Sequence, residues 1–372
     1  MVTIVTICGT SFLTNTAREN GFNLALVTRN ANVKTENEVP IEERKQICEL
    51  LRSLDTSLKF TSYSRLSAEI NSLVAYYKST NGTFKSDRHI LIATDTWLGK
   101  ITAQKLEDIL KIAGVDKVSV ETILGLRTND SKEFREGCSQ LLTTLYNLNN
   151  EASSKQGSLV LNLTGGFKAV LMILQSFAMM YSIPSFNLFE SNSELLWLPQ
   201  LPFKFDTREF VSNHLKEFRL LNINLFKEQI PSTLEFAILS TNDDQHMLSE
   251  WGELLWAVEQ PNLYRTKLYE PPVDFIKFAP GFQEQAEEFA RTSNKLEELN
   301  KKIDTIVKLI ASHSSGESFN LEGTTIKQIK GKATKAPDIS THEIYASNDD
   351  ATRIYCHKDG PHWVLDRLDK HL

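Results

Sequence analysis

The chain has 372 residues, with 41 Lys and Arg against 47 Asp and Glu, a net charge of −6 and 41% apolar residues. This length predicts at least two domains, and the apolar content excludes a fully disordered chain. The net negative charge excludes a protein that coats nucleic acid with a uniformly basic surface, but it leaves room for a local basic site. The four cysteines lie far apart, which disfavours a disulfide framework or a zinc knuckle and fits a reducing cytosol.

The sequence predicts neither export nor a membrane span. Its first nine residues lack the basic segment that opens a secretory signal peptide. The longest apolar stretch, residues 169–183, is interrupted by Gln175 and Ser176 and is shorter than the roughly 20 residues that a membrane helix needs. We therefore expect a soluble, cytoplasmic protein with no membrane partner.

The first two hundred residues repeat one pattern, in which a short β-rich apolar run leads into a small polar loop and then into a segment with helical periodicity. The four apolar runs are residues 2–7, 89–93, 118–123 and 159–163. Repeated strand–loop–helix units predict an α/β fold, with a parallel sheet covered by helices on both faces. A hairpin over residues 184–198 is expected to close the sheet.

Polar loops follow three of these predicted strands, at the edge where ligands bind in such folds. Residues 8–11, 94–96 and 164–166 are mostly small, hydroxylic or glycine, so a phosphate could approach the backbone closely. The last loop leads into Lys168, a cation that opposes the dipole of the helix it begins. Lys168 therefore either points into solvent or binds an anion. The chain has neither a G-x-G-x-x-G motif nor a Walker A lysine, so an ordinary NAD or ATP site is not expected.

Residues 206–274 differ from the rest of the chain, because they hold twelve acidic against six basic residues and so account for the net charge. Apolar residues recur there at steps of three and four, which predicts a helical connector. Trp251, Trp256 and Tyr264 fit either a groove for a partner or, more commonly, the core. A proline pair predicts a boundary linker over residues 268–272.

The last hundred residues are predicted to form a separate, small α+β domain. A strand is expected over residues 273–278, and the long helical pattern between residues 282 and 310 favours a helical hairpin over one free helix. Three more strands are predicted around residues 344–346, 352–357 and 363–368.

Candidate catalytic groups gather in this last region. It has a basic island, made of Lys327, Lys330, Lys332 and Lys335, and four of the eight histidines lie in the last 31 residues. Such cations, with Arg353 on a predicted strand, can neutralise the charge that grows on an RNA phosphate while imidazole or ammonium groups move protons. Carboxylates are not clustered at metal-ligand spacing, so a two-metal nuclease is disfavoured. The alternative is a solvated basic loop with histidines in hairpin turns.

Two segments of the first region resemble the signature loops of CARF domains, the CRISPR-associated Rossmann folds. They are residues 7–13, Ile-Cys-Gly-Thr-Ser-Phe-Leu, and residues 161–168, Leu-Asn-Leu-Thr-Gly-Gly-Phe-Lys. Residues 125–128 and 133–137 also look like that family, and the resemblance covers about residues 1–200.

The resemblance implies a homodimer that binds a cyclic oligoadenylate messenger across its two-fold axis. Some CARF proteins also cleave this activator slowly, and Ser11 and Lys168 are the candidates for positioning its phosphate. The implied ligand contacts are Gly9, Thr10, Ser11, Thr94, Asp95, Thr96, Thr164, Gly165, Gly166 and Lys168.

The last region resembles the RelE family of mRNA interferases, toxins that cut messenger RNA in the ribosomal A site without a metal. Residues 274–282, 352–355 and 369–372 carry this resemblance in the right order. It implies that Arg353 clamps the scissile phosphate and that His371 or Lys370 is the general acid. The implied helpers in deprotonating the 2′-hydroxyl are His342 or Lys332, with Lys330 in the same basic island. The paired lysines often seen on the preceding strand are replaced by residues 341–345, Thr-His-Glu-Ile-Tyr.

The sequence thus predicts a CARF sensor over residues 1–200, a helical connector over residues 201–272 and a RelE-like ribonuclease over residues 273–372. We expect a homodimer that is activated by a cyclic oligoadenylate, most simply cyclic tetra-adenylate, and that then cuts mRNA on the ribosome in antiviral defence. No metal, resident cofactor or DNA partner is expected. Two alternatives are a ring nuclease that degrades the messenger, with a non-catalytic last domain, and a ligand-controlled regulator that binds RNA or the ribosome without cutting.

Overall fold

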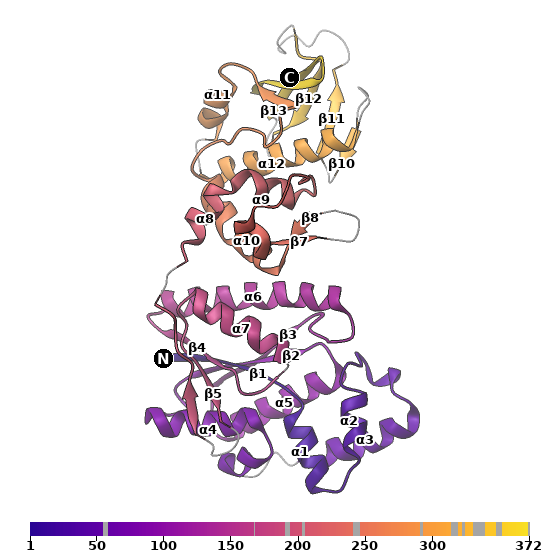
Figure 1. Cartoon of the computed structure of the whole chain (residues 1–372), viewed down its shortest axis with the longest axis vertical. Helices are drawn as coiled ribbons and strands as arrows, with labels where there is room; N and C mark the ends of the chain where they lie inside the picture. The colour runs from indigo at the N-terminus through magenta and orange to yellow at the C-terminus, as the bar shows by residue number, and fades with distance from the viewer. Residues whose placement is uncertain are drawn as a thin grey trace. The chain divides into compact units, whose positions relative to one another are not determined.

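The computed structural model divides the chain into two compact units, Met1–Phe205 and Asp206–Leu372 (Figure 1). The described residues are 1–54, 59–166, 168–189, 194–202, 205–240, 246–290, 293–313, 319–321, 324–329, 339–346 and 352–370. The predicted boundary between the connector and the last domain, at residue 272, lies inside the second unit.

The first unit is built on a six-stranded sheet with the order β3-β2-β1-β4-β5-β6. Its strands are β1 Val2–Ile7, β2 Arg88–Thr94, β3 Lys117–Ile123, β4 Ser158–Asn162, β5 Ser185–Leu188 and β6 Leu195–Trp197. The first five are parallel and β6 is antiparallel to β5, so the predicted Rossmann-like α/β fold and its closing hairpin are confirmed. The strand order reverses between β1 and β4, which is where open α/β sheets of this kind form a crevice for ligands.

Helices cover both faces of this sheet (Figure 1). One face carries α4 Ala68–Thr80 and α5 Trp97–Ile112, and the other carries α6 Ser131–Ser154 and α7 Lys168–Met180. Beside α4 and α5 lie the shorter elements, which are α1 Ser11–Glu19, α2 Leu24–Arg29, η1 Glu36–Glu38, α3 Ile41–Ser53 and η2 Phe60–Arg65. Strands buried on both faces explain why the apolar runs in the sequence are almost continuous rather than alternating.

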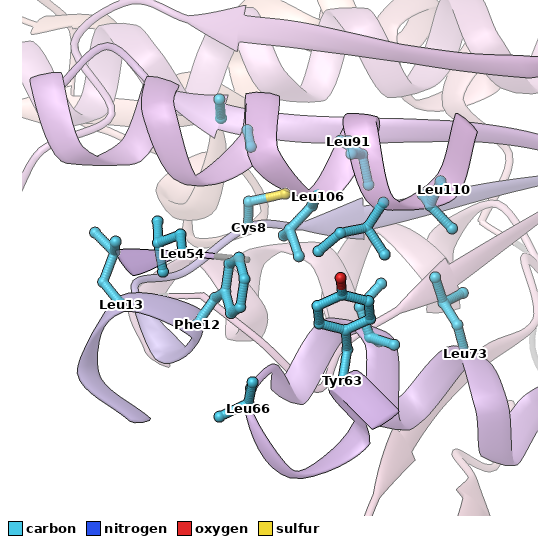
Figure 2. Close-up of a cluster of buried hydrophobic side chains, with 14 of the residues drawn as sticks. Cys8, Phe12, Leu13, Leu54, Tyr63, Leu66, Leu73, Leu91, Leu106 and Leu110 are labelled. Atoms are coloured by element: carbon cyan, nitrogen blue, oxygen red, sulfur yellow. The ribbon is translucent and has the colours of Figure 1, made fainter. Parts of the chain in front are cut away.

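A buried cluster fixes α1 beneath the sheet (Figure 2). Phe12 of α1 meets Tyr63 of η2 edge to face, with 6.0 Å between ring centroids. Leu91 of β2 and Leu106 of α5 pack above them, and Cys8 lies above Phe12 between Leu54 and Leu106. This packing holds the amino-terminal end of α1 at the carboxyl edge of β1.

The second unit begins with short helices and a small hairpin. Its elements are α8 Thr207–Asn213, α9 Leu215–Asn222, η3 Ser232–Ala237, β7 Ile238–Ser240, β8 His246–Leu248 and α10 Glu250–Tyr264. Trp256 and Tyr264 are buried and their rings meet edge to face, which confirms that they belong to the core, whereas Trp251 is only half-buried.

The rest of the second unit has the α+β arrangement that the sequence predicts. Strand β9 Ile276–Phe278 is followed by α11 Phe282–Phe289 and α12 Ser293–Ser312. The remaining strands are β10 Phe319–Leu321, β11 Thr324–Gln328, β12 His342–Tyr345, β13 Thr352–Asp359 and β14 His362–Lys370. The sheet order is β10-β11-β12-β13-β14-β9, antiparallel except for β9, which runs parallel to β14. Strands β10 and β11 were not expected, and they place Lys327 on a strand rather than in a loop.

Helix α12 joins this sheet to the helices that precede it. Asp304 is almost fully buried and forms an ion pair of 2.6 Å with Arg219 of α9, and it also accepts a hydrogen bond from Tyr264 of α10. One turn earlier, the fully buried Asn300 donates to the backbone oxygens of Tyr264 and Lys267 and accepts from the N–H of Tyr269. Tyr269, in the segment predicted as a boundary linker, is thus hydrogen-bonded to α12.

We expect Asp304→Ala to lower the free energy of unfolding by about 3–5 kcal/mol, because it leaves the Arg219 charge buried without its partner. Chemical denaturation of the full chain, followed by far-UV circular dichroism, measures this loss. The control is Lys301→Ala, which removes the exposed lysine of a pair with Glu297 and should cost under about 1 kcal/mol, because Arg265 still pairs with that carboxylate. Equal losses in the two variants would contradict a buried tie between α9 and α12.

Candidate functional site

Three glycines bring two loops together above the carboxyl ends of β1 and β4. A Cβ atom on Gly9 would lie 3.0 Å from the backbone nitrogen of Gly166, and one on Gly166 would lie 2.4 Å from Ile7 Cγ2. Gly166 also has a φ of 96°, which disfavours any side chain. A Cβ on Gly165 would lie 2.6 Å from the carboxylate of Glu69. The two signature loops thus meet backbone to backbone, and only glycine fits at the contact.

The buried carboxylate of Glu69 forms the floor beneath these loops. It lies in the first turn of α4 and is only 1% exposed. Its oxygens accept hydrogen bonds from the backbone N–H of Gly9 at 2.8 Å and from the hydroxyls of Ser11 and Ser67, each at 2.7 Å. The amino-terminal end of α4 also favours a negative charge at this position. Burial, and then the charge of Glu69, raises the pKa of Cys8 well above 9.0, which keeps that thiol protonated.

This arrangement determines what Gly9 and Ser11 can do. Both were predicted as ligand contacts, but the Gly9 N–H and the Ser11 hydroxyl proton are directed at Glu69. The Ser11 oxygen also accepts from the N–H of Ala68 at 3.1 Å. A hydroxyl has one proton to donate, so in this geometry Ser11 orders the loop and has no proton left for a phosphate.

The predicted contacts after β2 are also bonded internally. Thr94, Asp95 and Thr96 are all at least nine-tenths buried. The two threonine hydroxyls lie 2.8 Å apart, and Thr96 caps α5 by accepting from the N–H of Gly99. Asp95 lies 3.5 Å from the guanidinium of Arg127, which pairs in turn with Glu133. The structure therefore does not present these three side chains to solvent.

The remaining predicted contacts lie near the carboxyl ends of β1 and β4. Thr10 precedes α1 without using its side chain as a cap, and Thr164 accepts from the N–H of Leu188, which leaves the Thr164 hydroxyl proton to donate. Lys168 is exposed at the start of α7 and has no ion-pair partner among the described residues. Two helix amino-terminal ends and a lysine make this edge of the sheet a favourable place for an anion.

We expect Glu69→Ala to lower the free energy of unfolding by roughly 2–4 kcal/mol, because three buried or half-buried donors lose their acceptor. Thermal or urea unfolding of the full chain measures this change. Glu19→Ala is the control, since it removes a carboxylate whose 3.4 Å pair with Arg65 is exposed, and it should change stability by under about 1 kcal/mol. A Glu69→Ala variant as stable as the control would contradict the role of Glu69 as the floor.

A second candidate site lies on one face of the sheet in the second unit. Residues directly opposite each other in antiparallel strands point to the same face. Arg353 lies opposite Tyr345 and Asp369, while Glu343 lies opposite Tyr355 and Lys327. We call this the polar face, and its members are Lys327, Glu343, Tyr345, Arg353, Tyr355, Arg367 and Asp369. The other face carries Ile326, Ile344, Ile354 and Cys356, which belong to the core formed with α11 and α12.

Arg353 is the most unusual group on the polar face. It is 5% exposed, and its Cζ lies 3.3 Å from the centroid of the Tyr345 ring. It donates to the backbone oxygen of Thr352 at 3.3 Å, and the described residues place no carboxylate within ion-pair distance of it. Burying a cation without a counterion is unfavourable, so this geometry fits a site that receives an anion.

Neighbouring groups add a second cation and a proton donor. Arg367 lies 3.4 Å from Asp369 and 5.7 Å from the Tyr355 ring centre. Burial raises the pKa of Tyr355, and the negative charges of Glu343 and Asp369 raise it further. Tyr355 therefore stays protonated and can donate a hydrogen bond at neutral pH.

The predicted acid–base residues are not all brought to this face. His342 is buried on the opposite face, where its ring meets Trp363 at 5.0 Å, because it is an odd number of residues from Tyr345 along β12. Lys370 ends β14, whereas His371, Lys330 and Lys332 lie outside the described residues. The structure thus separates His342 from Arg353 and leaves Arg353 as the best-placed member of the predicted set.

Three members of this polar face, Tyr345, Tyr355 and Arg367, are not among the residues predicted from the sequence. The alternation of polar and apolar residues along the strands is the signal that could have identified them. Arg353 and Tyr355 flank Ile354 on β13, and Arg367 and Asp369 flank Leu368 on β14, so each polar pair points to one face of the sheet. In the described part of the chain, no three His, Cys, Asp or Glu side chains are grouped to hold a metal ion. Among the described helices, none is long and apolar enough to cross a bilayer.

Residues 64–201 match the family model of CRISPR-associated protein (Cas_APE2256). This region is therefore similar to a CRISPR-associated family. It includes Glu69 and the loop from Thr164 to Gly166, while the first signature loop precedes it. Among solved structures, the chain is similar to Can2 from Sulfobacillus thermosulfidooxidans in complex with cyclic tetra-adenylate, with 9% identity and a TM-score of 0.26. That alignment covers 71% of this chain and 66% of the Can2 chain, and no curated protein matches the chain.

Proposed function

We propose that the first unit binds a cyclic oligoadenylate and that the second unit is a metal-independent endoribonuclease, which cuts mRNA on the ribosome during CRISPR antiviral defence. The observation that carries the nuclease assignment is Arg353, a buried cation that the described residues leave without a carboxylate partner. The match of residues 64–201 to a CRISPR-associated family supports the setting.

In the proposed sensor, phosphates of the ring lie at the carboxyl ends of β1 and β4. The backbone at the start of α1, the Thr164 hydroxyl and Lys168 supply the positive and hydrogen-bonding groups. Gly165 and Gly166 let the ligand approach the backbone closely. Glu69 holds the loop after β1 in place from below and does not touch the ligand.

The surface of α7 supports the expected homodimer. This helix has no charged residue after Lys168, and Met172 is 66% exposed. A surface helix that is uncharged along three turns is unfavourable in water, and a second copy of the chain is the proposed cover. Because Lys168 begins α7, pairing through α7 places each proposed ligand site beside the helix that contacts the partner, so one ring could bind both protomers.

We expect Met172→Glu to convert the dimer into a monomer, because it introduces a charge into the proposed apolar contact. Analytical ultracentrifugation of the full chain measures the oligomeric state. Ile112→Glu is the control, because Ile112 is 60% exposed on α5 and lies outside the α7 surface. A wild-type monomer, or a Met172→Glu dimer, would contradict an interface through α7.

The proposed reaction is attack of a ribose 2′-oxygen on the adjacent phosphorus, with departure of the 5′-oxygen of the next nucleotide. Arg353 and Arg367 stabilise the negative charge that develops on the phosphate oxygens. His371 or Lys370 gives a proton to the leaving oxygen. We assign removal of the 2′-proton to Lys332 or Lys330, because His342 lies on the other face of the sheet.

We expect full-length protein, ribosomes and mRNA to give A-site cuts only when a cyclic oligoadenylate of the right ring size is added. The measurement is primer extension on mRNA incubated with cyclic tetra-adenylate or cyclic hexa-adenylate, with and without ribosomes. Cleavage of the ring without any cut in RNA would instead support the ring nuclease. RNA that is retained but intact would support a non-enzymatic regulator.

Two substitutions separate the sites. Arg353→Ala should lower the cutting rate by about 100-fold or more and leave binding of the activator unchanged, because the charge lost acts on the transition state. Lys168→Ala should weaken binding of the activator by about 10-fold, while saturating activator restores cutting. Isothermal titration with the ring and single-turnover cleavage provide the two readouts. Loss of both activities in Arg353→Ala would indicate a folding defect.

A further inference from the structure

The contact between Tyr345 and Arg353 is the closest cation–ring contact in the described part of the chain. The two residues face each other directly across β12 and β13, and the guanidinium carbon lies 3.3 Å from the ring centroid. Lys327 reaches the same ring from the next strand, with its Nζ 5.2 Å from the centroid. Tyr345 is 39% exposed while Arg353 is 5% exposed, so the ring borders the solvent and the arginine lies beneath the surface.

This distance fixes the orientation of the guanidinium. Its C–N bonds are about 1.3 Å long, so a guanidinium standing upright over the ring centre would bring one or two nitrogens to about 2.0–2.6 Å from the ring plane. That separation is sterically forbidden, and the guanidinium must lie nearly flat over the ring. Its N–H groups then point sideways, parallel to the ring, where they can form two parallel hydrogen bonds to phosphate oxygens.

The neighbouring groups do not provide the same restraint. Asp369 lies opposite Arg353 on the other side, but its carboxylate pairs with Arg367 at 3.4 Å. The hydrogen bond from Arg353 to Thr352 is long at 3.3 Å, and Nε has no partner among the described residues. An aromatic face attracts the cation without occupying its N–H groups, whereas a carboxylate would compete with the phosphate.

We propose that Tyr345 is a positioning residue that holds the Arg353 guanidinium flat over its ring, so that N–H groups which no carboxylate occupies among the described residues can bind the scissile phosphate. The ring makes the contact, and its hydroxyl is not required. This inference rests on the proposed ribonuclease function of the polar face. It assigns a role to a tyrosine on the strand where the resembling family often carries lysines.

The test compares Tyr345→Phe with Tyr345→Leu in the full chain, using activator, ribosomes and mRNA. Tyr345→Phe keeps the stacked ring and should retain the cutting rate within about threefold. Tyr345→Leu should lower kcat by about 10- to 100-fold with little change in KM, because a misplaced group costs rate more than binding. Phe236→Leu removes a comparably exposed ring from another part of the second unit and is the matched control, expected to cut like wild type. A Tyr345→Leu enzyme with wild-type kcat overturns the inference.

A double substitution shows whether Tyr345 acts through Arg353. Arg353→Lys removes the flat guanidinium, so adding Tyr345→Leu to that variant should lower the rate no further. An additional 10-fold loss in the double variant would overturn the inference, because Tyr345 would then act by another route.

A measurement independent of cleavage separates this inference from the proposed function. The Nε–H resonance of Arg353 should be shifted upfield by the ring in wild type and in Tyr345→Phe, and should return to its ordinary position in Tyr345→Leu. Titration with inorganic phosphate, followed at this resonance, should show binding at least threefold weaker in Tyr345→Leu than in Tyr345→Phe. If wild type never cuts RNA, the proposed function fails, and the phosphate titration alone decides the inference: equal binding overturns it.

Discussion

A charge that leaves water must find a partner, and this constraint organises both units of the chain. Glu69 meets it with three hydrogen bonds, and in doing so it ties the loop after β1 to α4. Asp304 meets it with Arg219 and Tyr264, and so joins α9, α10 and α12. Arg353 is the exception, because only an aromatic ring and a backbone oxygen accompany it among the described residues. Glu69 and Asp304, whose charges have partners, stabilise the fold. Arg353, whose charge has none among the described residues, lies at the proposed site of RNA cleavage.

The fold could be predicted from the sequence because its signals are local. Strand, polar loop and helix follow one another along the chain, and each unit of the pattern is short enough to be recognised without knowledge of its neighbours. The pair Gly165-Gly166 before Lys168 is a local signal too, because glycine allows two backbones to approach closely. The α/β and α+β arrangements therefore followed from the sequence, together with the closing hairpin.

The arrangement of side chains at the two sites was harder to predict. It depends on contacts between residues far apart in the sequence, and on which face of the sheet each strand residue points to. Glu69 lies 58 residues from Ser11, and nothing nearby distinguishes it from an ordinary acidic residue in the first turn of a helix. His342 looks as suitable as Tyr345 in the sequence, but neighbouring odd and even positions of a strand point to opposite faces. The face on which each lies is set by how β12 pairs with β13, and only the folded sheet supplies that register.

The polar contacts of α12 bear on how such a chain could have been assembled. Asn300 and Asp304 are buried only because α9, α10 and the segment after α10 cover them. A fragment made of the last hundred residues alone would lack these covering segments. It would expose both side chains, together with the apolar surface that Leu268 and Ile223 cover in the whole chain. The last sheet and α12 therefore depend on the preceding helices for burial of their polar groups. A gene fusion that brought in this sheet would have had to bring in those helices with it.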